Sequence, residues 1–179
     1  MKKILLPLLF VAPLAAQSFE LGLNVSRQSY TTQTAPPGIE PQDKTVVAGR
    51  IGYSFLDLGP ALFQVTAVYQ PKADTEVQSS GAATPWKVGH EYAGVGVMFN
   101  FKALVAIGAG VDYRFEKSTY TDTLTTSHTF SRPWARVNAG YAFPTPLVKP
   151  FIGIEAAVPL TKEDLAPKFQ VGLYGGVRF

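Results

Sequence analysis

Apolar residues recur at every second position along most of this chain, and they seldom follow the i, i+3, i+4 spacing of a helix. The clearest case runs from Val105 to Glu116, where Val, Ile, Ala, Tyr and Phe alternate with Ala, Gly, Asp, Arg and Glu. A period of two is the signature of a β-strand with two different faces. The pattern predicts an all-β chain of eight strands, within residues 19–26, 46–55, 63–70, 94–101, 105–116, 135–143, 152–158 and 168–179.

The connections between these segments alternate between short and long. Residues 56–60, 100–102 and 144–148 form short links. The other links are longer and rich in Thr, Ser, Pro and charge, and they comprise residues 31–44, 71–89, 117–131 and 160–167. Short turns at one end and long loops at the other are typical of transmembrane barrels. We therefore expect all four long segments to be loops on the outer side.

The first residues, MKKILLPLLFVAPLAAQS, read as a secretory signal: two lysines, an apolar stretch from Ile4 to Ala16, and then small residues. The stretch is shorter than the roughly 20 residues that a membrane-spanning helix needs, and Pro7 and Pro13 would break a packed helix. The sequence predicts cleavage after Ala16, with Ser18 as the alternative. Residues 1–16 are then the signal peptide, and residues 17–179 form one domain.

Charge and cysteine content remove several classes of function. Without Lys2 and Lys3, the 16 basic residues become 14, against 13 acidic ones. This balance, with no Lys/Arg cluster, argues against a nucleic-acid partner. The chain has no Cys, which excludes disulfides and thiolate metal sites.

The nature of the two faces decides which one points inward. The polar face consists mostly of Gly, Ser, Asn and Gln, whereas the outside of a soluble barrel would carry many Lys and Glu side chains. Aromatic residues on the apolar face gather near strand ends, where the interfacial girdles of membrane barrels lie. We therefore predict an eight-stranded antiparallel transmembrane up-and-down β-barrel in the outer membrane. A soluble periplasmic lipocalin-like binder, with the apolar face inside, is the lesser alternative.

Three segments carry a resemblance to a known family: IGAGVDYRFE from Ile107 to Glu116, PFIGIEAAVPL from Pro150 to Leu160, and the final VGLYGGVRF. They resemble the small eight-stranded outer-membrane barrels of the OmpA/OmpX and OmpW-like porin families. The resemblance covers the whole mature chain. It implies that Phe179, with Val177 two residues before it, is the carboxy-terminal signal read by the barrel-assembly machinery.

Charged residues on the lumen face balance, and an eight-stranded barrel is just wide enough for side chains to fill. Since buried charges must pair, we predict a structural network that plugs the lumen, with Glu20 bonded to Arg178 and Glu155 to Arg136. The alternative is a narrow pore or a conduit for small hydrophobic ligands, suggested by Met98, Phe151 and Tyr174 on the same face. The residues of the predicted network are Glu20, Arg50, Asp112, Arg114, Glu116, Arg136, Glu155 and Arg178.

The two histidines, His90 and His128, are the candidate catalytic groups. His128 lies between Ser127 and Ser131 in TTSHTFS. Lipid A deacylases of this architecture carry a serine two residues after the histidine, but here that residue is Phe130. We expect no enzyme activity, no metal site and no cofactor.

The remaining function is a structural or surface-interaction role, exercised by a monomer through its outer loops. Outer-membrane lipids and lipopolysaccharide are the surroundings that this location implies. No loop sequence identifies a specific ligand.

Overall fold

The computed structural model describes residues 18–30, 39–41, 43–79, 86–121, 125–163 and 166–179. The predicted signal peptide, residues 1–16, lies outside the described residues. No helix among them is both long and apolar enough to cross a membrane.

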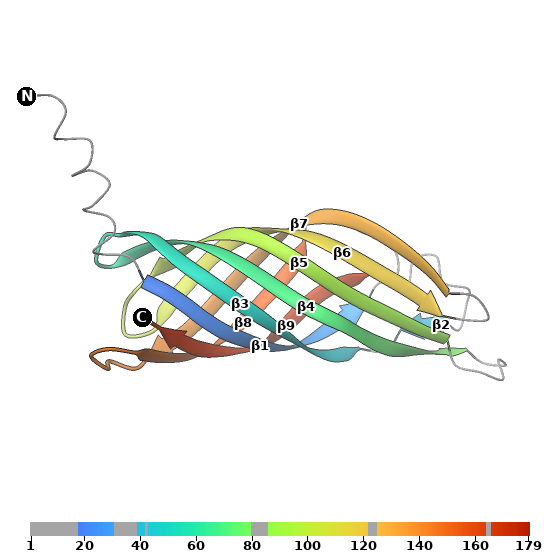
Figure 1. The fold of residues 1–179 in the computed structure, drawn as a ribbon, viewed down its shortest axis with the longest axis horizontal. Coiled ribbons are helices and arrows are strands. Elements are labelled where there is room, and N and C mark those ends of the chain that lie inside the picture. Colours follow the sequence, from blue (N-terminus) through green and yellow to red (C-terminus); the bar gives the residue numbers. More distant parts are fainter. Residues whose placement is uncertain (1–17, 31–38, 42, 80–85, 122–124, 164–165) are drawn as a thin grey trace, which may run out of the picture.

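Eight long antiparallel strands form a closed barrel (Figure 1). The sheet order is β2-β4-β3-β1-β9-β8-β7-β6-β5, and pairing of β4 with β5 closes the ring. The short strand β2 lies outside the ring and pairs with the far end of β4. The strands are β1 (Ser18–Tyr30), β2 (Ile39–Pro41), β3 (Lys44–Asp57), β4 (Ala61–Ser79), β5 (Trp86–Phe101), β6 (Ala106–Thr121), β7 (Thr125–Ala142), β8 (Lys149–Pro159) and β9 (Pro167–Arg178).

The faces are arranged as the alternation predicts, with apolar side chains outside and polar ones inside. On β6, Tyr113 and Phe115 are exposed, whereas Asp112, Arg114 and Glu116 are almost completely buried. An exterior of this kind is stable only against lipid hydrocarbon. The lipocalin-like alternative, with apolar residues filling the barrel, is therefore wrong.

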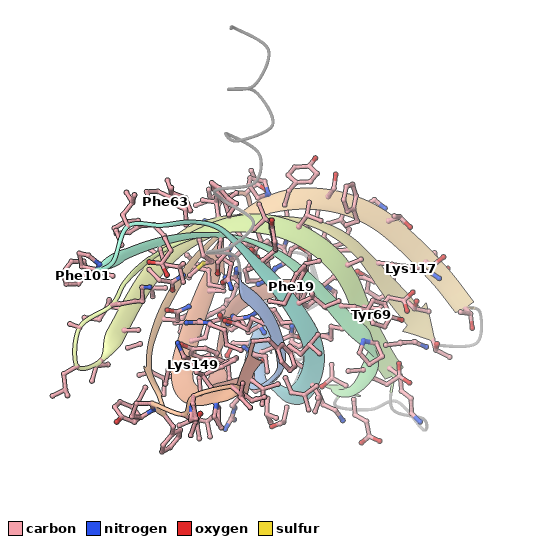
Figure 2. All side chains as sticks on the ribbon, turned by 60° about the vertical axis from the view of Figure 1, so that its left-hand side comes forward. Phe19, Phe63, Tyr69, Phe101, Lys117 and Lys149 are labelled. Carbon is pink, nitrogen blue, oxygen red and sulfur yellow. The ribbon has the colours of Figure 1, made fainter. Side chains whose placement is uncertain are left out.

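The apolar exterior forms a band with clear limits. Phe63 and Phe99, with ring centroids 5.1 Å apart, lie near the edge of the band at the end that carries the short turns. We call this end periplasmic, as the sequence analysis expects. Figure 2 shows Phe63 and Phe101 on the outside of the barrel. At the other edge, Lys117 on β6 faces Glu91 on β5 across 3.4 Å, and both side chains are partly exposed. The hydrocarbon layer thus ends between Phe115 and Lys117 on β6.

Four strands continue well beyond this band. Residues 71–89 and 117–131 were predicted to be loops, but their described parts belong mostly to β4, β5, β6 and β7. β6 and β7 stay in one register from Ala106↔Gly140 to Thr121↔Thr125. Outside the membrane both faces of a strand can be polar, so the alternation that marks the other strands fades. We call the part formed by residues 71–79, 86–92, 116–121 and 125–131 the outer sheet; it lies on the right in Figure 1.

Candidate functional site: the charged lumen

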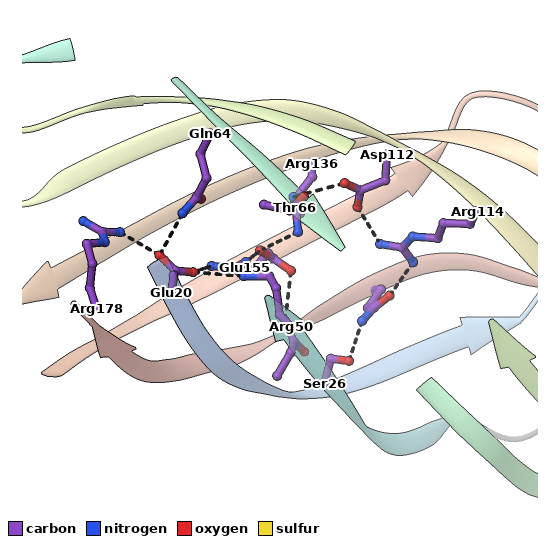
Figure 3. Close-up of polar contacts among 12 residues, drawn as sticks. Glu20, Ser26, Arg50, Gln64, Thr66, Asp112, Arg114, Arg136, Glu155 and Arg178 are labelled. Carbon is purple, nitrogen blue, oxygen red and sulfur yellow. Dashed lines mark hydrogen bonds and ion pairs between the residues drawn. The ribbon is translucent and has the colours of Figure 1, made fainter. Parts of the chain in front are cut away.

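The structure places all eight residues of the predicted charge network inside the barrel. Figure 3 labels all of them except Glu116. Seven of them are buried, and Arg178 is partly exposed at the periplasmic mouth. They reach the lumen from β1, β3, β6, β7, β8 and β9, because alternate residues of each strand point inward.

The periplasmic part of the network is centred on Glu20. Its carboxylate accepts hydrogen bonds from Arg50 Nη2 at 2.7 Å, Arg178 Nη2 at 2.7 Å and Gln64 Nε2 at 3.3 Å. Arg50 also reaches Glu155, with 2.6 Å between Nη1 and Oε2. One arginine therefore bridges two carboxylates and links three strands.

The middle part joins Glu155 to Asp112 through Arg136. Arg136 Nη2 lies 3.0 Å from Asp112 Oδ1, and Nη1 lies 3.6 Å from Glu155 Oε2. Arg114 Nη2 lies 3.4 Å from Asp112 Oδ2, and Arg114 Nη1 donates to Gln170 Oε1 at 2.8 Å. Both ion pairs expected from strand parity, Glu20 with Arg178 and Glu155 with Arg136, are present.

The outer part surrounds Glu116, which is completely buried. Arg132 donates to both carboxylate oxygens, from Nε at 2.7 Å and from Nη2 at 2.8 Å. Trp134 Nε1 donates to Oε1 at 2.6 Å, and His90 Nε2 lies 2.9 Å from Oε2. We call Glu116, His90, Arg132 and Trp134 the outer cluster; it lies at the level where the apolar band ends.

Sequence reasoning missed three members of the outer cluster. His90 and Trp134 were not assigned to the lumen, and Arg132 was not placed on a strand. Their parity was readable, because Arg132 and Trp134 lie four and two residues before Arg136, which was assigned to the lumen. The predicted strand began at Ala135, so Arg132 and Trp134 fell outside it.

Aromatic rings pack against the buried guanidinium groups. The Arg114 guanidinium carbon lies 4.5 Å from the Tyr92 ring centroid and 4.1 Å from that of Trp134. The Arg50 guanidinium lies 4.7 Å from the Tyr174 centroid. Such contacts stabilise a desolvated cation and fill space at the same time.

The lumen is also packed with apolar groups near the periplasmic mouth. Met98 and Leu62 are buried, and Phe151 packs against Tyr174 with ring centroids 5.6 Å apart. Glycine makes room for this filling: a Cβ at Gly96 would collide with the Asp112 carboxylate and with the β6 backbone. Met98, Phe151 and Tyr174, the residues that suggested a conduit, lie within this packing.

The periplasmic mouth itself is open and charged. A hollow of about 410 Å³ is lined by residues that include Leu62, Lys102, Lys149 and Arg178. Asp57, the last residue of β3 and below the apolar band, accepts a hydrogen bond from Lys102 Nζ at 2.6 Å and one from the Gly59 N–H at 3.0 Å. Although burial raises the pKa of Asp57, these hydrogen bonds hold it below its ordinary value.

The two histidines lie in different places. His90 is buried in the outer cluster, whereas His128 is exposed on the inner face of the outer sheet, 3.3 Å from Glu163 and stacked on Phe130. His128 had been expected in a loop, and it lies on β7. Within the described ranges, no group of three or more His, Cys, Asp or Glu side chains is arranged to hold a metal ion.

The predicted assembly signal lies at the seam of the barrel. Val177 faces Leu21 of β1, and the Phe179 N–H donates to the Phe19 carbonyl at 2.9 Å. The Phe179 ring is exposed on the outer wall.

Comparison with solved structures shows the fold. The chain is similar to Ail, the attachment invasion locus protein of Yersinia pestis, with a TM-score of 0.56, 11% identity, and coverage of 90% of this chain and 98% of that one. It is also similar to a major outer membrane protein of Thermus thermophilus, with a TM-score of 0.60, 12% identity, and coverage of 91% and 98%. OprG from Pseudomonas aeruginosa gives a TM-score of 0.53, 9% identity, and coverage of 91% and 95%.

A scan of protein-family models and a search of curated proteins found no match. The structural likenesses agree with the fold predicted from the sequence. The chain has the fold of a small outer-membrane β-barrel.

Proposed function

We propose that this protein is a plugged, non-conducting outer-membrane barrel that acts by holding a rigid β-sheet at the cell surface. The observation that carries the proposal is the combination of a filled lumen with strands that continue past the apolar band. A barrel that transports a solute needs an open lumen, whereas a barrel that holds a sheet at the cell surface needs a rigid membrane-spanning part.

The filled lumen supports the first half of the proposal. Five arginines and four carboxylates of the described residues point into it and pair with one another, and they are Arg50, Arg114, Arg132, Arg136, Arg178, Glu20, Asp112, Glu116 and Glu155. Buried pairs of this kind are costly to break one at a time, so they hold the eight strands at fixed positions.

The outer sheet supports the second half. β5 pairs with β6, and β6 with β7, in continuous register, while β4 pairs with β5 beyond a register shift between Gln70 and Ala73, so the sheet is a stiff extension of the barrel wall. Surface residues there include Thr125, Ser127 and Thr129, which offer polar contacts. One structural neighbour, Ail of Yersinia pestis, is named as an attachment invasion locus protein, and that name suits presentation of a sheet at the cell surface.

Single-cysteine labelling tests the orientation, since the chain has no Cys of its own. Thr129→Cys on the outer sheet should react with a membrane-impermeant maleimide on intact cells. Leu104→Cys, in an exposed periplasmic turn, should react only after lysis. The reverse pattern would place the outer sheet in the periplasm and overturn the proposal.

Planar-bilayer recording separates the plug from the narrow pore, which the hollow at the periplasmic mouth favours. We expect the purified wild-type barrel to give no stable channels. A variant with Glu116 and Arg132 replaced by Ala should still give no channels, because the contacts of Glu20 and Asp112 lie deeper in the lumen. Channels should appear only when those contacts are removed as well. Steady conductance of the wild-type protein would support the pore instead.

A further inference from the structure

The periplasmic mouth of the lumen carries more positive charge than the residues around it neutralise. The charged residues that line its hollow of about 410 Å³ are Asp57, Lys102, Lys149 and Arg178. Asp57 already accepts a hydrogen bond from Lys102 Nζ at 2.6 Å. The lining therefore supplies no further carboxylate side chain for Lys149 or for Arg178.

Glu20, the carboxylate that Arg178 does contact, is shared between two arginines. It accepts hydrogen bonds from Arg178 Nη2 and from Arg50 Nη2, each at 2.7 Å. Arg178 Nε is buried and has no hydrogen-bond partner in the described part of the chain. The five arginines of the described lumen face only four carboxylates, and Lys149 raises this surplus to two positive charges. A main-chain carboxylate at Phe179 would still leave one.

The sheet also holds Lys149 and Arg178 close together. They face each other in the register of β8 and β9. Directly paired residues of antiparallel strands point to the same side of the sheet, with Cβ atoms about 4.5–5.5 Å apart, and like charges at such positions repel. Figure 2 labels Lys149 at the end of the barrel that is turned forward. Among the described residues, no carboxylate makes an ion pair with Lys149, so an anion between the two cations would remove their repulsion.

The rest of the lining is apolar. Phe143 and Phe179 belong to it, and both rings are also exposed on the wall of the barrel. The hollow therefore borders the apolar exterior as well as the charged lumen, and this combination suits an anionic group attached to an apolar body. The apolar lining residues are Leu62, Ala103, Leu104, Ala106, Ala142, Phe143, Pro144 and Phe179.

We propose that the periplasmic mouth binds a phosphate group, with Lys149 and Arg178 as its main contacts. An arginine presents planar donors that match phosphate oxygens, and a lysine adds a point charge. Two sources carry this chemistry, namely the headgroup of an anionic phospholipid in the adjoining leaflet and free phosphate. The apolar margin at Phe143 and Phe179 favours the phospholipid. The proposal goes beyond the proposed function and needs neither a rigid outer sheet nor a particular side of the membrane.

Lys149→Glu is the test variant. Lys149 is exposed and makes no ion pair within the described chain, so its replacement breaks no contact of the lumen network. The introduced carboxylate faces Arg178, so attraction takes the place of repulsion. We therefore expect the variant to be at least as stable to urea as wild type in phosphatidylcholine vesicles. Lys168→Glu is the matched control, because it makes the same change of charge at an exposed position at the other end of β9.

Native mass spectrometry of the full-length barrel, released from micelles of a non-ionic detergent, measures the lipid that stays bound. The probes are dioleoylphosphatidylglycerol, dioleoylglycerol, which has the same chains and no phosphate, and inorganic phosphate. We expect wild type and Lys168→Glu to bind the first phosphatidylglycerol alike. Lys149→Glu should bind it at least about tenfold more weakly, because one charge-assisted contact is lost. Dioleoylglycerol should not be retained by any of the three.

The inorganic phosphate arm separates the two sources. Phosphatidylglycerol that stays bound in the presence of phosphate assigns the site to the lipid headgroup. A phosphate adduct in place of the lipid, again lost in Lys149→Glu, assigns it to free phosphate. Equal binding of phosphatidylglycerol by wild type and Lys149→Glu, equal binding of dioleoylglycerol, or no adduct of either kind on heat-modifiable, folded wild type would overturn the proposal.

Discussion

Replacement of Glu116 by Gln is the sharpest test of how the outer cluster holds the barrel together. The glutamine keeps the shape of the side chain but loses the charge that Arg132 contacts twice and that Trp134 and His90 contact once each. Arg132 then stays buried with no counter-ion beside it. Breaking one partner of a buried ion pair costs about 3–5 kcal/mol, so we expect the free energy of unfolding to fall by this amount.

The second partner of the pair gives a double-mutant cycle. Arg132→Met removes the buried cation and keeps the length of the side chain. Because the double variant leaves no unpaired guanidinium, its loss should be smaller than the sum of the two single losses by about 1–3 kcal/mol. The surface pair of Glu91 with Lys117, at 3.4 Å, is the control: Glu91→Gln should change stability by less than about 1 kcal/mol.

Urea unfolding of the barrel refolded into lipid vesicles measures these differences. Trp134, which is fully buried beside Glu116, reports the transition through its fluorescence. A loss below about 1 kcal/mol for Glu116→Gln, or additive losses in the cycle, would show that the outer cluster is not the coupled unit that its hydrogen bonds suggest.

Three further predictions concern other parts of the barrel. Gly96→Ala should lower the unfolding free energy by more than about 1 kcal/mol, because its Cβ collides with the β6 backbone, whereas Gly49→Ala on the open outer wall should be near neutral in the same urea assay. Asp57→Asn should lower the free energy of unfolding at pH 7. Since the pKa of Asp57 is lowered in the folded state, the stability difference between wild type and variant is fully present above the ordinary carboxyl pKa and should vanish as the pH falls through the lowered value. Lys102→Met should show the same pH dependence of stability. Deletion of Phe179 should reduce the amount of heat-modifiable protein in outer-membrane fractions, and an unchanged amount would count against its role as an assembly signal.

The membrane-spanning part of the barrel was readable because lipid and lumen impose opposite demands on neighbouring residues. Val111, Tyr113 and Phe115 had to be apolar, while Asp112 and Arg114 between them had to be polar. That contrast repeats on every strand inside the apolar band. It also set the parity from which the Glu20–Arg178 pair was inferred, because the first and last strands of a closed barrel must be neighbours.

The outer sheet was missed for the same physical reason. Above the band both faces of β7 meet polar surroundings, so Thr125, Ser127 and His128 carry no alternating pattern that marks a strand. Hydrogen bonds along the backbone hold them in place instead, and these leave little trace in the sequence. Arg132 and Trp134 lie where the apolar band gives way to the polar region above it. The charge network predicted from the sequence therefore lacked these two residues.

The seam between β1 and β9 has a consequence for the timing of biogenesis. These strands come from opposite ends of the described chain, and their register runs from Glu20↔Arg178 to Tyr30↔Pro167. The first strand to leave the secretion channel must therefore wait for the last one before the ring can close. Contacts so distant in sequence are slow to form, and until they form the chain carries two unpaired strand edges, which are prone to aggregation.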